Sequence, residues 1–369
     1  MSAIERVDVY AYRLTYVHGT YVMSGGREID VLESVVVGVT TDEGVVGFGE
    51  VCPLGPAYLP AHAEGAKAAL RELAPLVLGL DVGDLGRIGD ALDDGLRGHA
   101  YAKSAIDVAC LDALGRLVRR PVATLLGGRR TDRFPLYVAV PLGPPDEMAA
   151  FVRERGAEGI HRFQLKAGAD PHEDAERARA AVAATGPGDV IVIDANGGWP
   201  LQDAVVAARL LEPLERVFLE QPCATLEECL IVRSRTTLPM VLDEVIDDVP
   251  SLLRAYEAKS FEAFNLKISK VGGLTQARLL RDLAHALGLR VTIEDTWGGD
   301  VTTAAVSHLA ASTAERTLFT VSFMNDWTRE HVAGYRPRSD NGFGSPPKGD
   351  GLGIEVDREQ LGEPLFSFP

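Results

Sequence analysis

Cysteine is scarce in this chain, and long apolar runs are missing. The four cysteines, Cys52, Cys110, Cys223 and Cys229, form no C-x-x-C pair and no zinc-ligand spacing. Their number argues against a disulfide-rich fold and favours a reducing cytoplasm. No apolar run reaches the roughly 18 residues of a membrane span, and the amino-terminal MSAIERVDVY resembles a strand more than a signal peptide. We therefore expect a cytoplasmic protein.

Basic residues are also fewer than acidic residues. Lys and Arg number 37 against 53 Asp and Glu, which gives a formal charge of −16 at pH 7. Such a surface repels phosphate backbones and anionic lipid, so we expect neither a nucleic acid nor a membrane as partner. Hydrophobic residues make up 46% of the 369-residue chain, as in ordinary globular proteins. The length favours two domains, or one barrel with an accessory unit.

The first 125 residues predict an α+β unit. Apolar residues alternate around residues 7–11, 35–39 and 45–49, and Thr41–Asp42–Glu43–Gly44 forms a turn between the last two runs. This pattern indicates three antiparallel strands. Helical spacing follows over about 61–78 and 101–119.

Residues 126–328 have a different pattern, in which short apolar runs alternate with helical stretches. The eight predicted strands are FPLYVAV, RFQLK, VIVID, VFLE, MVLD, FNLK, VTIE and TLFTV. The helices between them include 172–184, 201–212, 225–236, 249–257, 274–287 and 300–312. Eight such units predict a parallel α/β barrel. An open doubly wound sheet is the alternative, but the chain lacks G-x-G-x-x-G. Residues 329–369 are rich in Gly and Pro and predict an ordered tail that wraps back.

A charged residue ends six successive strands, and the six recur every 23–28 residues. They are Lys166, Asp194, Glu220, Asp243, Lys267 and Glu294. In barrel enzymes the chemistry lies at the carboxyl ends of the strands, so these residues predict a catalytic site.

Asp194, Glu220 and Asp243 end three neighbouring strands, and carboxylates that converge stay ionised together only around a cation. An all-oxygen site with room for water suits Mg²⁺, with Mn²⁺ as a substitute. The alternative is that some of these acids cap the helices that follow.

Lys166 and Lys267 end the second and sixth predicted strands, which lie on opposite walls of an eight-stranded barrel. A substrate carboxylate on the metal would hold its α-carbon between the two side chains. The alternative is that each lysine extends its ammonium group to solvent.

Several motifs carry a resemblance to a known family. The helix AKSAIDVACLDALGRLVRRPVATLLGG and the strand-end motifs LKAG, IDAN, LEQP, LDE, LKISKVGG and IEDTWGG resemble the enolase superfamily, in particular its muconate lactonizing enzyme subgroup. The segments GEVCPLGPAYLPAHA and GHAYAKSAID resemble hydroxyproline betaine epimerases and cis-3-hydroxyproline dehydratases. EQPCATLEE and DTWGGD favour the epimerases, whereas SGGREID and IED favour the dehydratases.

The resemblance implies a capping domain (1–125), a modified (β/α)7β barrel (126–328) and a tail (329–369) that returns to the cap. It implies one Mg²⁺ per subunit on Asp194, Glu220 and Asp243, with Lys166 and Lys267 as acid/base catalysts, in a homo-oligomer. One position departs from the family's K-x-K motif, whose first lysine is Gln164 here.

The implied reaction is removal of a proton α to a carboxylate, and a neutral lysine is the base. We expect epimerisation of a proline-like amino acid or betaine. Dehydration of cis-3-hydroxyproline is the alternative, and cycloisomerisation of a muconate-type acid is the third possibility. A different class of function is a non-catalytic binding scaffold on the same barrel. The predicted substrate contacts are Tyr58, Gln164, Glu294, Asp295, Trp297 and Phe323. Aromatic faces attract an ammonium group. Glu294 and Asp295 could hydrogen-bond Lys267 or a substrate amine.

Overall fold

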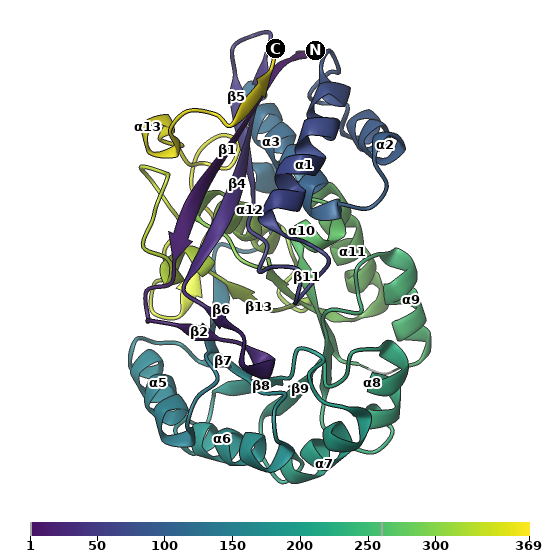
Figure 1. Ribbon diagram of the computed structural model, residues 1–369, viewed down its shortest axis with the longest axis vertical. Coiled ribbons are helices and arrows are strands. Elements are labelled where there is room, and N and C mark those ends of the chain that lie inside the picture. Colours follow the sequence, from purple (N-terminus) through teal and green to yellow (C-terminus); the bar gives the residue numbers. More distant parts are fainter. Residues whose placement is uncertain (1, 260) are drawn as a thin grey trace.

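The computed structural model describes residues 2–259 and 261–369, with an amino-terminal cap above a barrel (Figure 1). The cap comprises β1 (Ile4–Thr15), β2 (Tyr21–Val22), η1 (Ser24–Gly26), β3 (Glu28–Ile29), β4 (Val31–Thr41), β5 (Val46–Val51), α1 (Ala63–Leu73), η2 (Ala74–Val77), α2 (Leu85–Gly95) and α3 (Ala100–Leu117). The short α4 (Val122–Leu125) leads into the barrel.

The predicted antiparallel strands form the cap sheet, whose order is β15-β1-β4-β5. The β4–β5 turn contains Gly44 at a φ of 76°, which favours glycine. Two further glycines in β5 allow α3 to approach the sheet closely. A Cβ on Gly47 would lie 2.2 Å from the Ala109 carbonyl oxygen, and one on Gly49 would lie 2.0 Å from that of Ala105. The weak apolar row over residues 45–49 therefore marks a helix-packing surface.

The eight predicted strands all form and close into a parallel barrel, as the pairing of β13 with β6 shows. In chain order the elements are β6 (Phe134–Val140), α5 (Pro145–Ala157), β7 (Arg162–Lys166), α6 (Pro171–Ala183), β8 (Val190–Asp194), α7 (Leu201–Leu211), β9 (Val217–Glu220), α8 (Leu226–Arg233), β10 (Met240–Leu242), α9 (Val249–Glu257), β11 (Ala263–Lys267), α10 (Ile268–Val271), α11 (Leu274–Leu287), β12 (Arg290–Glu294), α12 (Asp300–Ala311) and β13 (Leu318–Ser322). The α/β barrel prediction is confirmed.

The tail after the barrel returns to the cap. It contains η3 (Met324–Trp327), β14 (Phe343–Gly344), α13 (Arg358–Leu361) and β15 (Phe366–Phe368). Strand β15 pairs antiparallel with β1, through Val7 and Phe368 among others, and lies in yellow at the cap end of the molecule in Figure 1.

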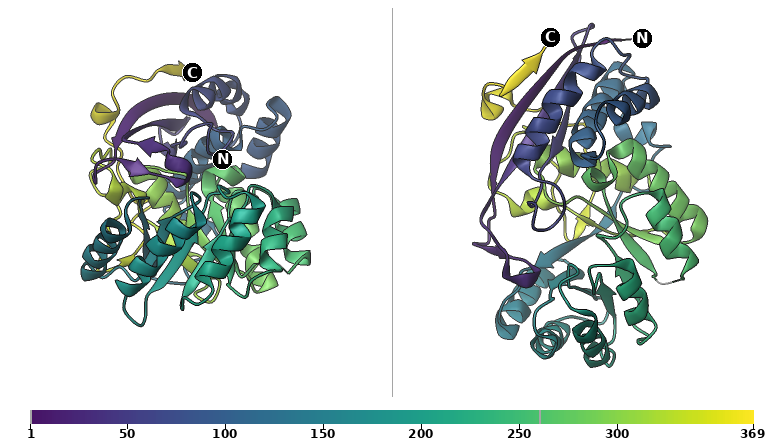
Figure 2. Two further views of the ribbon diagram at one scale, coloured as in Figure 1. Left: turned by 60° about the horizontal axis from the view of Figure 1, so that its bottom comes forward. Right: turned by 45° about the vertical axis from the view of Figure 1, so that its right-hand side comes forward.

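Two cap segments reach the carboxyl end of the barrel. Figures 1 and 2 show the first, with β2 and η1 in dark purple, descending beside β7 and β8. There the Ser24 hydroxyl donates to the Asp194 carbonyl oxygen at 3.2 Å. The second segment follows β5, and its Cys52 carbonyl accepts from the Thr296 hydroxyl at 3.1 Å. The cap thus covers the barrel end that carries the charged residues.

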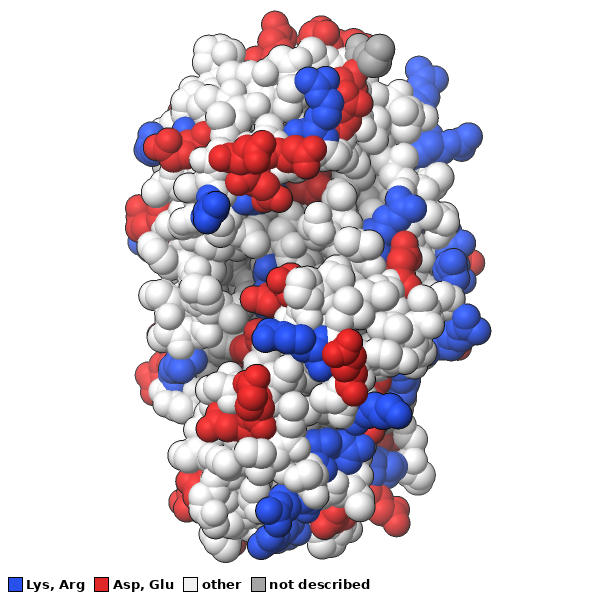
Figure 3. Space-filling model, turned by 90° about the vertical axis from the view of Figure 1, so that its right-hand side faces the viewer, with Lys and Arg blue, Asp and Glu red and all other residues white. Residues whose placement is uncertain are grey.

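Acidic and basic side chains are interspersed over most of the face in Figure 3. Within the described residues, none of the helices combines the length and apolar composition needed to cross a bilayer.

Candidate active site

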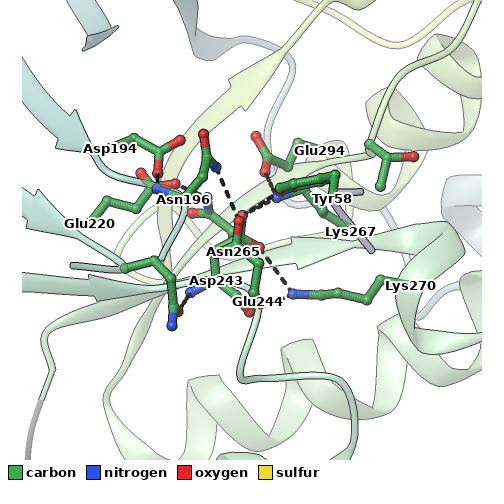
Figure 4. A network of polar contacts seen from close by, with 12 residues as sticks. Tyr58, Asp194, Asn196, Glu220, Asp243, Glu244, Asn265, Lys267, Lys270 and Glu294 are labelled. Carbon is green, nitrogen blue, oxygen red and sulfur yellow. Dashed lines mark hydrogen bonds and ion pairs between the residues drawn. The ribbon is translucent and has the colours of Figure 1, made fainter. Parts of the chain in front are cut away.

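The charged residues at the strand ends are buried and lie side by side at one end of the barrel (Figure 4). Strand register aligns Lys166 with Asp194, Asp194 with Glu220, and Lys267 with Glu294. Asp243 directly follows β10, and its backbone N–H donates to the Gln221 side chain at 2.9 Å. All six residues are at most 6% exposed. The barrel therefore concentrates four carboxylates and two amines where water has little access.

Glu220 lies at the centre of the carboxylates. Its Oε1 accepts from Gln164 Nε2 at 2.9 Å and from Asn265 Nδ2 at 2.7 Å. Burial raises the pKa of Glu220 well above its ordinary value, and the charges of Asp194 and Asp243 raise it further. The charges of Asp194 and Asp243 are therefore close enough to oppose the ionisation of Glu220.

A further carboxylate, Glu244, lies beside Asp194, Glu220 and Asp243. Its Oε1 accepts from Asn196 Nδ2 at 3.0 Å, whereas its buried Oε2 has no hydrogen-bond partner. Burial, Asp243 and Asp194 raise the pKa of Glu244 to about 7. Asn196 also donates its backbone N–H to Asp194 Oδ1 at 2.8 Å, and so joins the two acids.

The two lysines lie on opposite walls of the barrel, on β7 and β11. Lys166 Nζ pairs with Asp194 Oδ2 at 2.5 Å. Lys267 pairs with Asp243, and with Glu294 Oε1 at 2.9 Å. Burial lowers the pKa of both lysines, but their carboxylate partners raise it more, so the net pKa of each lies above its ordinary value. With these pairings both side chains are ammonium groups.

Each lysine lies near one tyrosine of the cap. The ring of Tyr58 lies 5.7 Å from Lys267 Nζ, and its hydroxyl donates to Asp243 Oδ2 at 3.1 Å. On the other wall, burial raises the pKa of Tyr21, and the nearby Lys166 ammonium group opposes that rise. The cap therefore completes the site on both sides.

A small cavity of about 30 Å³ lies between the lysines. Five of the six predicted substrate contacts line it, namely Tyr58, Gln164, Glu294, Asp295 and Trp297. Tyr21, Met23, Leu54, Met324 and Trp327 add apolar and aromatic walls. The edge-to-face contact of Trp297 with Trp327, at 5.6 Å between ring centroids, makes one wall rigid.

The structure does not place Phe323 in this cavity, which corrects that prediction. Its ring packs edge-to-face against Phe134 at 5.9 Å and lines a neighbouring cavity. The reason is an irregularity in β13, where Val291 pairs with Leu318 but Thr292 pairs with Thr320. The extra residue reverses the alternation along the strand, so Phe323 does not share the inward face of Phe319.

Asp295 has a different role from Glu294. It accepts the backbone N–H groups of Ser269 at 3.0 Å and Thr296 at 2.7 Å, as well as the Ser269 hydroxyl. These contacts join α10, which follows β11, to the loop after β12. Glu294, in contrast, contacts Lys267 directly.

The polar residues missed from the sequence include Glu244, Lys270 and Tyr137. Lys270 donates to Asp243 Oδ1 at 3.0 Å, and Tyr137 donates its hydroxyl to Glu294. Lys270 follows Lys267 by nearly one helical turn in LKISK, which is the spacing that places two side chains on one face. Tyr137 and Ala139 are two residues apart in β6, so they share the face that lines the cavity. A hydroxyl group in an otherwise apolar strand was the sequence feature that could have identified Tyr137.

The donor set fits a hard divalent cation. In the described part of the chain no cluster of His, Cys, Asp or Glu is already arranged to hold a metal ion, because the acids bind lysines instead. However, three strand ends supply only carboxylate oxygens, the charges of Asp194 and Asp243 oppose the ionisation of Glu220, and the buried Glu244 Oε2 has no partner. Mg²⁺ prefers such oxygen ligands.

Comparisons with known proteins identify the family. Residues 147–360 match the family model "Enolase C-terminal domain-like", and residues 23–127 match "Mandelate racemase / muconate lactonizing enzyme, N-terminal domain". The chain therefore belongs to the enolase superfamily, whose enzymes abstract a proton α to a carboxylate.

Relatives match over the full length. A cis-3-hydroxy-L-proline dehydratase from Roseibium aggregatum is 43% identical over 99% of both chains. An N-succinyl-L-Arg/Lys racemase from Bacillus cereus is 28% identical over 98% of this chain and 97% of the racemase. A crystal structure of an enolase superfamily member from Roseovarius nubinhibens, complexed with magnesium, superposes with a TM-score of 0.92 at 35% identity, covering all of both chains.

Proposed function

We propose that this enzyme removes the α-proton of a proline-like amino acid in a reaction that depends on one Mg²⁺ per subunit. Asp194, Glu220 and Asp243 would hold the ion, and Lys166 and Lys267 would be the acid/base catalysts. The observation that carries the proposal is the position of the two lysines on opposite walls of a cavity beside these carboxylates. When bound, Mg²⁺ supplies positive charge that stabilises the electron pair left on the substrate carboxylate.

The two lysines allow two outcomes. The lysine that acts as base must first lose the proton that its carboxylate pairing favours. As a neutral amine it takes the α-proton, and the C–H electron pair moves into the carboxylate. If the other lysine returns a proton to the opposite face, the α-carbon is epimerised. If a β-hydroxyl leaves instead, the C–O bond breaks, the hydroxyl takes a proton from an ammonium group, and water and a cyclic enamine form. That enamine tautomerises to an imine.

We place dehydration of a 3-hydroxyproline first and epimerisation second, which reverses the order expected from sequence. The support is the full-length similarity to a cis-3-hydroxy-L-proline dehydratase at 43% identity. Epimerisation stays as the second candidate because an amine lies on each wall of the cavity.

The walls of the cavity favour a small substrate with a single carboxylate. Among the described residues that line it, the cations are Lys166 and Lys267, and no arginine contributes. A muconate or an N-succinyl amino acid has a second carboxylate, which would be buried here without a further cationic partner. The aromatic walls suit the ring and the ammonium group of a proline.

The test is a substrate panel with two readouts. Both stereoisomers of proline, its betaine and the 3-hydroxyprolines would be incubated with Mg²⁺, and products followed by polarimetry and by trapping of the cyclic imine. We expect imine from cis-3-hydroxyproline and none in excess chelator. Turnover of a sugar acid or a dicarboxylate, with no reaction of any proline derivative, would contradict the proposal.

A further inference from the structure

The two lysines have unequal surroundings. In the described part of the chain, Asp194 is the carboxylate that pairs with Lys166. Lys267 pairs with two carboxylates, Asp243 and Glu294. Of these two partners, Asp243 is a proposed metal ligand and Glu294 is not. Glu294 is therefore the partner that Lys267 retains when Asp243 binds the ion.

Glu294 is in turn held by Tyr137. The Tyr137 hydroxyl donates to Glu294 Oε2, while Glu294 Oε1 accepts from Lys267. Because each oxygen has one donor, the plane of the carboxylate is fixed from both sides. Burial and the Glu294 charge raise the pKa of Tyr137 well above its ordinary value, so its hydroxyl keeps its proton and stays a donor.

Tyr137 is well placed to act as a fixed support. It lies on β6, separated from β12 in the barrel by β13, and its side chain is 6% exposed. Its ring packs edge-to-face against Trp327 at 6.2 Å. The two aromatic residues line both the site cavity and a neighbouring cavity of about 220 Å³. A side chain packed in this way holds its hydroxyl with little loss of entropy on binding.

We propose that Tyr137 is a positioning residue for Lys267, acting through Glu294, and that it serves one face of the substrate only. This inference rests on the proposed α-proton chemistry. On that face the α C–H bond breaks, its electron pair moves into the substrate carboxylate, and the proton passes to Lys267 Nζ. Tyr137 exchanges no atom with the substrate. It keeps Glu294, and with it the Lys267 side chain, aligned with the α-carbon.

The experiment measures exchange of the α-proton in D₂O for each stereoisomer of the proline substrate, with Mg²⁺ present. The Lys166→Ala variant defines the isomer that Lys267 serves, because that isomer still exchanges. Lys267→Ala defines the other isomer in the same way. Tyr137→Phe keeps the ring and removes the hydroxyl. We expect it to slow exchange of the Lys267-side isomer by about 10- to 100-fold, the range for a hydrogen bond to a charged group.

Further measurements make the test specific. Exchange of the Lys166-side isomer and the affinity for Mn²⁺, measured by titration without substrate, should stay within about twofold of wild type in Tyr137→Phe. Tyr10→Phe makes the same change at a buried tyrosine of the cap sheet and should leave both isomers unaffected. Glu294→Gln should repeat the one-sided loss, and the double variant should be no slower than Glu294→Gln alone, because the two residues act in series.

Equal losses for both isomers, or no loss for either, would overturn the positioning role while leaving the proposed function intact. Additive losses in the double variant would overturn it too. Failure of wild-type enzyme to exchange the α-proton of any proline derivative would instead refute the proposed function, and the inference with it.

Discussion

The buried acids at the barrel mouth and those at the seam between cap and barrel share their chemistry but not their surroundings. The mouth acids are Asp194, Glu220 and Asp243. The seam acids are Glu50 on β5 and Asp112 on α3. Both groups are almost fully buried, but their hydrogen-bond partners differ.

The seam acids bind mainly to uncharged donors that belong to fixed backbone or packed side chains. Glu50 accepts the backbone N–H groups of Gly299 at 3.0 Å and Thr302 at 2.9 Å, as well as two hydroxyls. Glu50, which belongs to the cap, therefore satisfies N–H groups at the amino terminus of the barrel helix α12. Asp112 accepts the backbone N–H groups of Phe48 at 2.9 Å and Leu352 at 2.7 Å, which joins the cap to the tail, and its Oδ1 also pairs with Arg116 at 3.1 Å.

The mouth acids accept mostly from side chains that end in charges or amides, and they face one another. Backbone N–H donors satisfy a buried carboxylate without any ion, whereas converging carboxylates leave net negative charge that attracts a cation. The comparison teaches that burial of an acid does not by itself indicate a metal ligand. The kind of donor around the acid separates the two roles.

The largest expected effect comes from neutralising a mouth acid. Asp243→Asn should lower turnover by at least about 10³-fold, because the metal supplies several kcal/mol of stabilisation. Mn²⁺ affinity, measured by titration, should fall with it, while the melting temperature stays within a few degrees of wild type. Asp247→Asn, at an exposed position of the same loop, is the matched control. Full turnover of Asp243→Asn in excess chelator would refute the proposed metal site.

Removing a seam acid should lower the stability of the fold and leave metal binding nearly unchanged. Glu50→Ala leaves two backbone N–H groups and two hydroxyls without their acceptor, so the free energy of unfolding should fall by about 3–5 kcal/mol. Denaturant unfolding measures this loss, with Glu43→Ala in the exposed hairpin as control. Mn²⁺ affinity of the folded variant should change little. A metal affinity that collapsed as it does in Asp243→Asn would erase the distinction between seam and mouth.

The seam also contains a neutral base whose protonation should weaken it. His308 Nδ1 accepts from the Ala123 N–H at 3.3 Å, and Nε2 donates to the Leu352 carbonyl oxygen at 3.0 Å, which requires the uncharged ring. Burial lowers the pKa of His308 from 6.5 to about 4. Below pH 6.5 the unfolded chain binds this proton before the folded one does, so stability is lost as the pH falls from 6.5 to about 4.

That loss should reach about 3 kcal/mol, at 1.36 kcal/mol per pKa unit. Thermal unfolding between pH 4 and 8 measures it. His308→Gln, whose amide can accept and donate at similar places but does not titrate, should show a shallower pH dependence. An unchanged pH dependence in this variant would mean that His308 is not the group responsible.

The smallest expected effect lies where the cap meets the mouth. Tyr58→Phe keeps the ring near Lys267 and loses one hydrogen bond to Asp243, so KM for a proline substrate should rise about 3- to 10-fold. Tyr58→Ala also removes the ring and should raise KM more, with little change in Mn²⁺ affinity. Steady-state kinetics and metal titration separate the two effects. A fall in metal affinity larger than the rise in KM would assign Tyr58 to the metal instead.

Much of this organisation was predictable from sequence because it is local. The period of two in the strands, the charged residue at each of six strand ends, and the turn at Gly44 all depend on neighbours along the chain. The helix α2 was missed because Gly86, Gly89 and Gly95 weaken its helical pattern. Packing against α3 stabilises it instead, and that packing does not appear in a short window of sequence.

The sequence by itself determined the eight-stranded barrel and the six charges at its mouth, since alternation and spacing are properties of single strands. The tertiary structure alone decided which acids face one another and which meet backbone N–H groups, because those donors come from elements far apart in the chain. It also decided that Phe323 points away from the site, because one extra residue in β13 reverses the alternation. The contact of Tyr137 with Glu294 exists only because the barrel closes and brings its first strand close to its seventh.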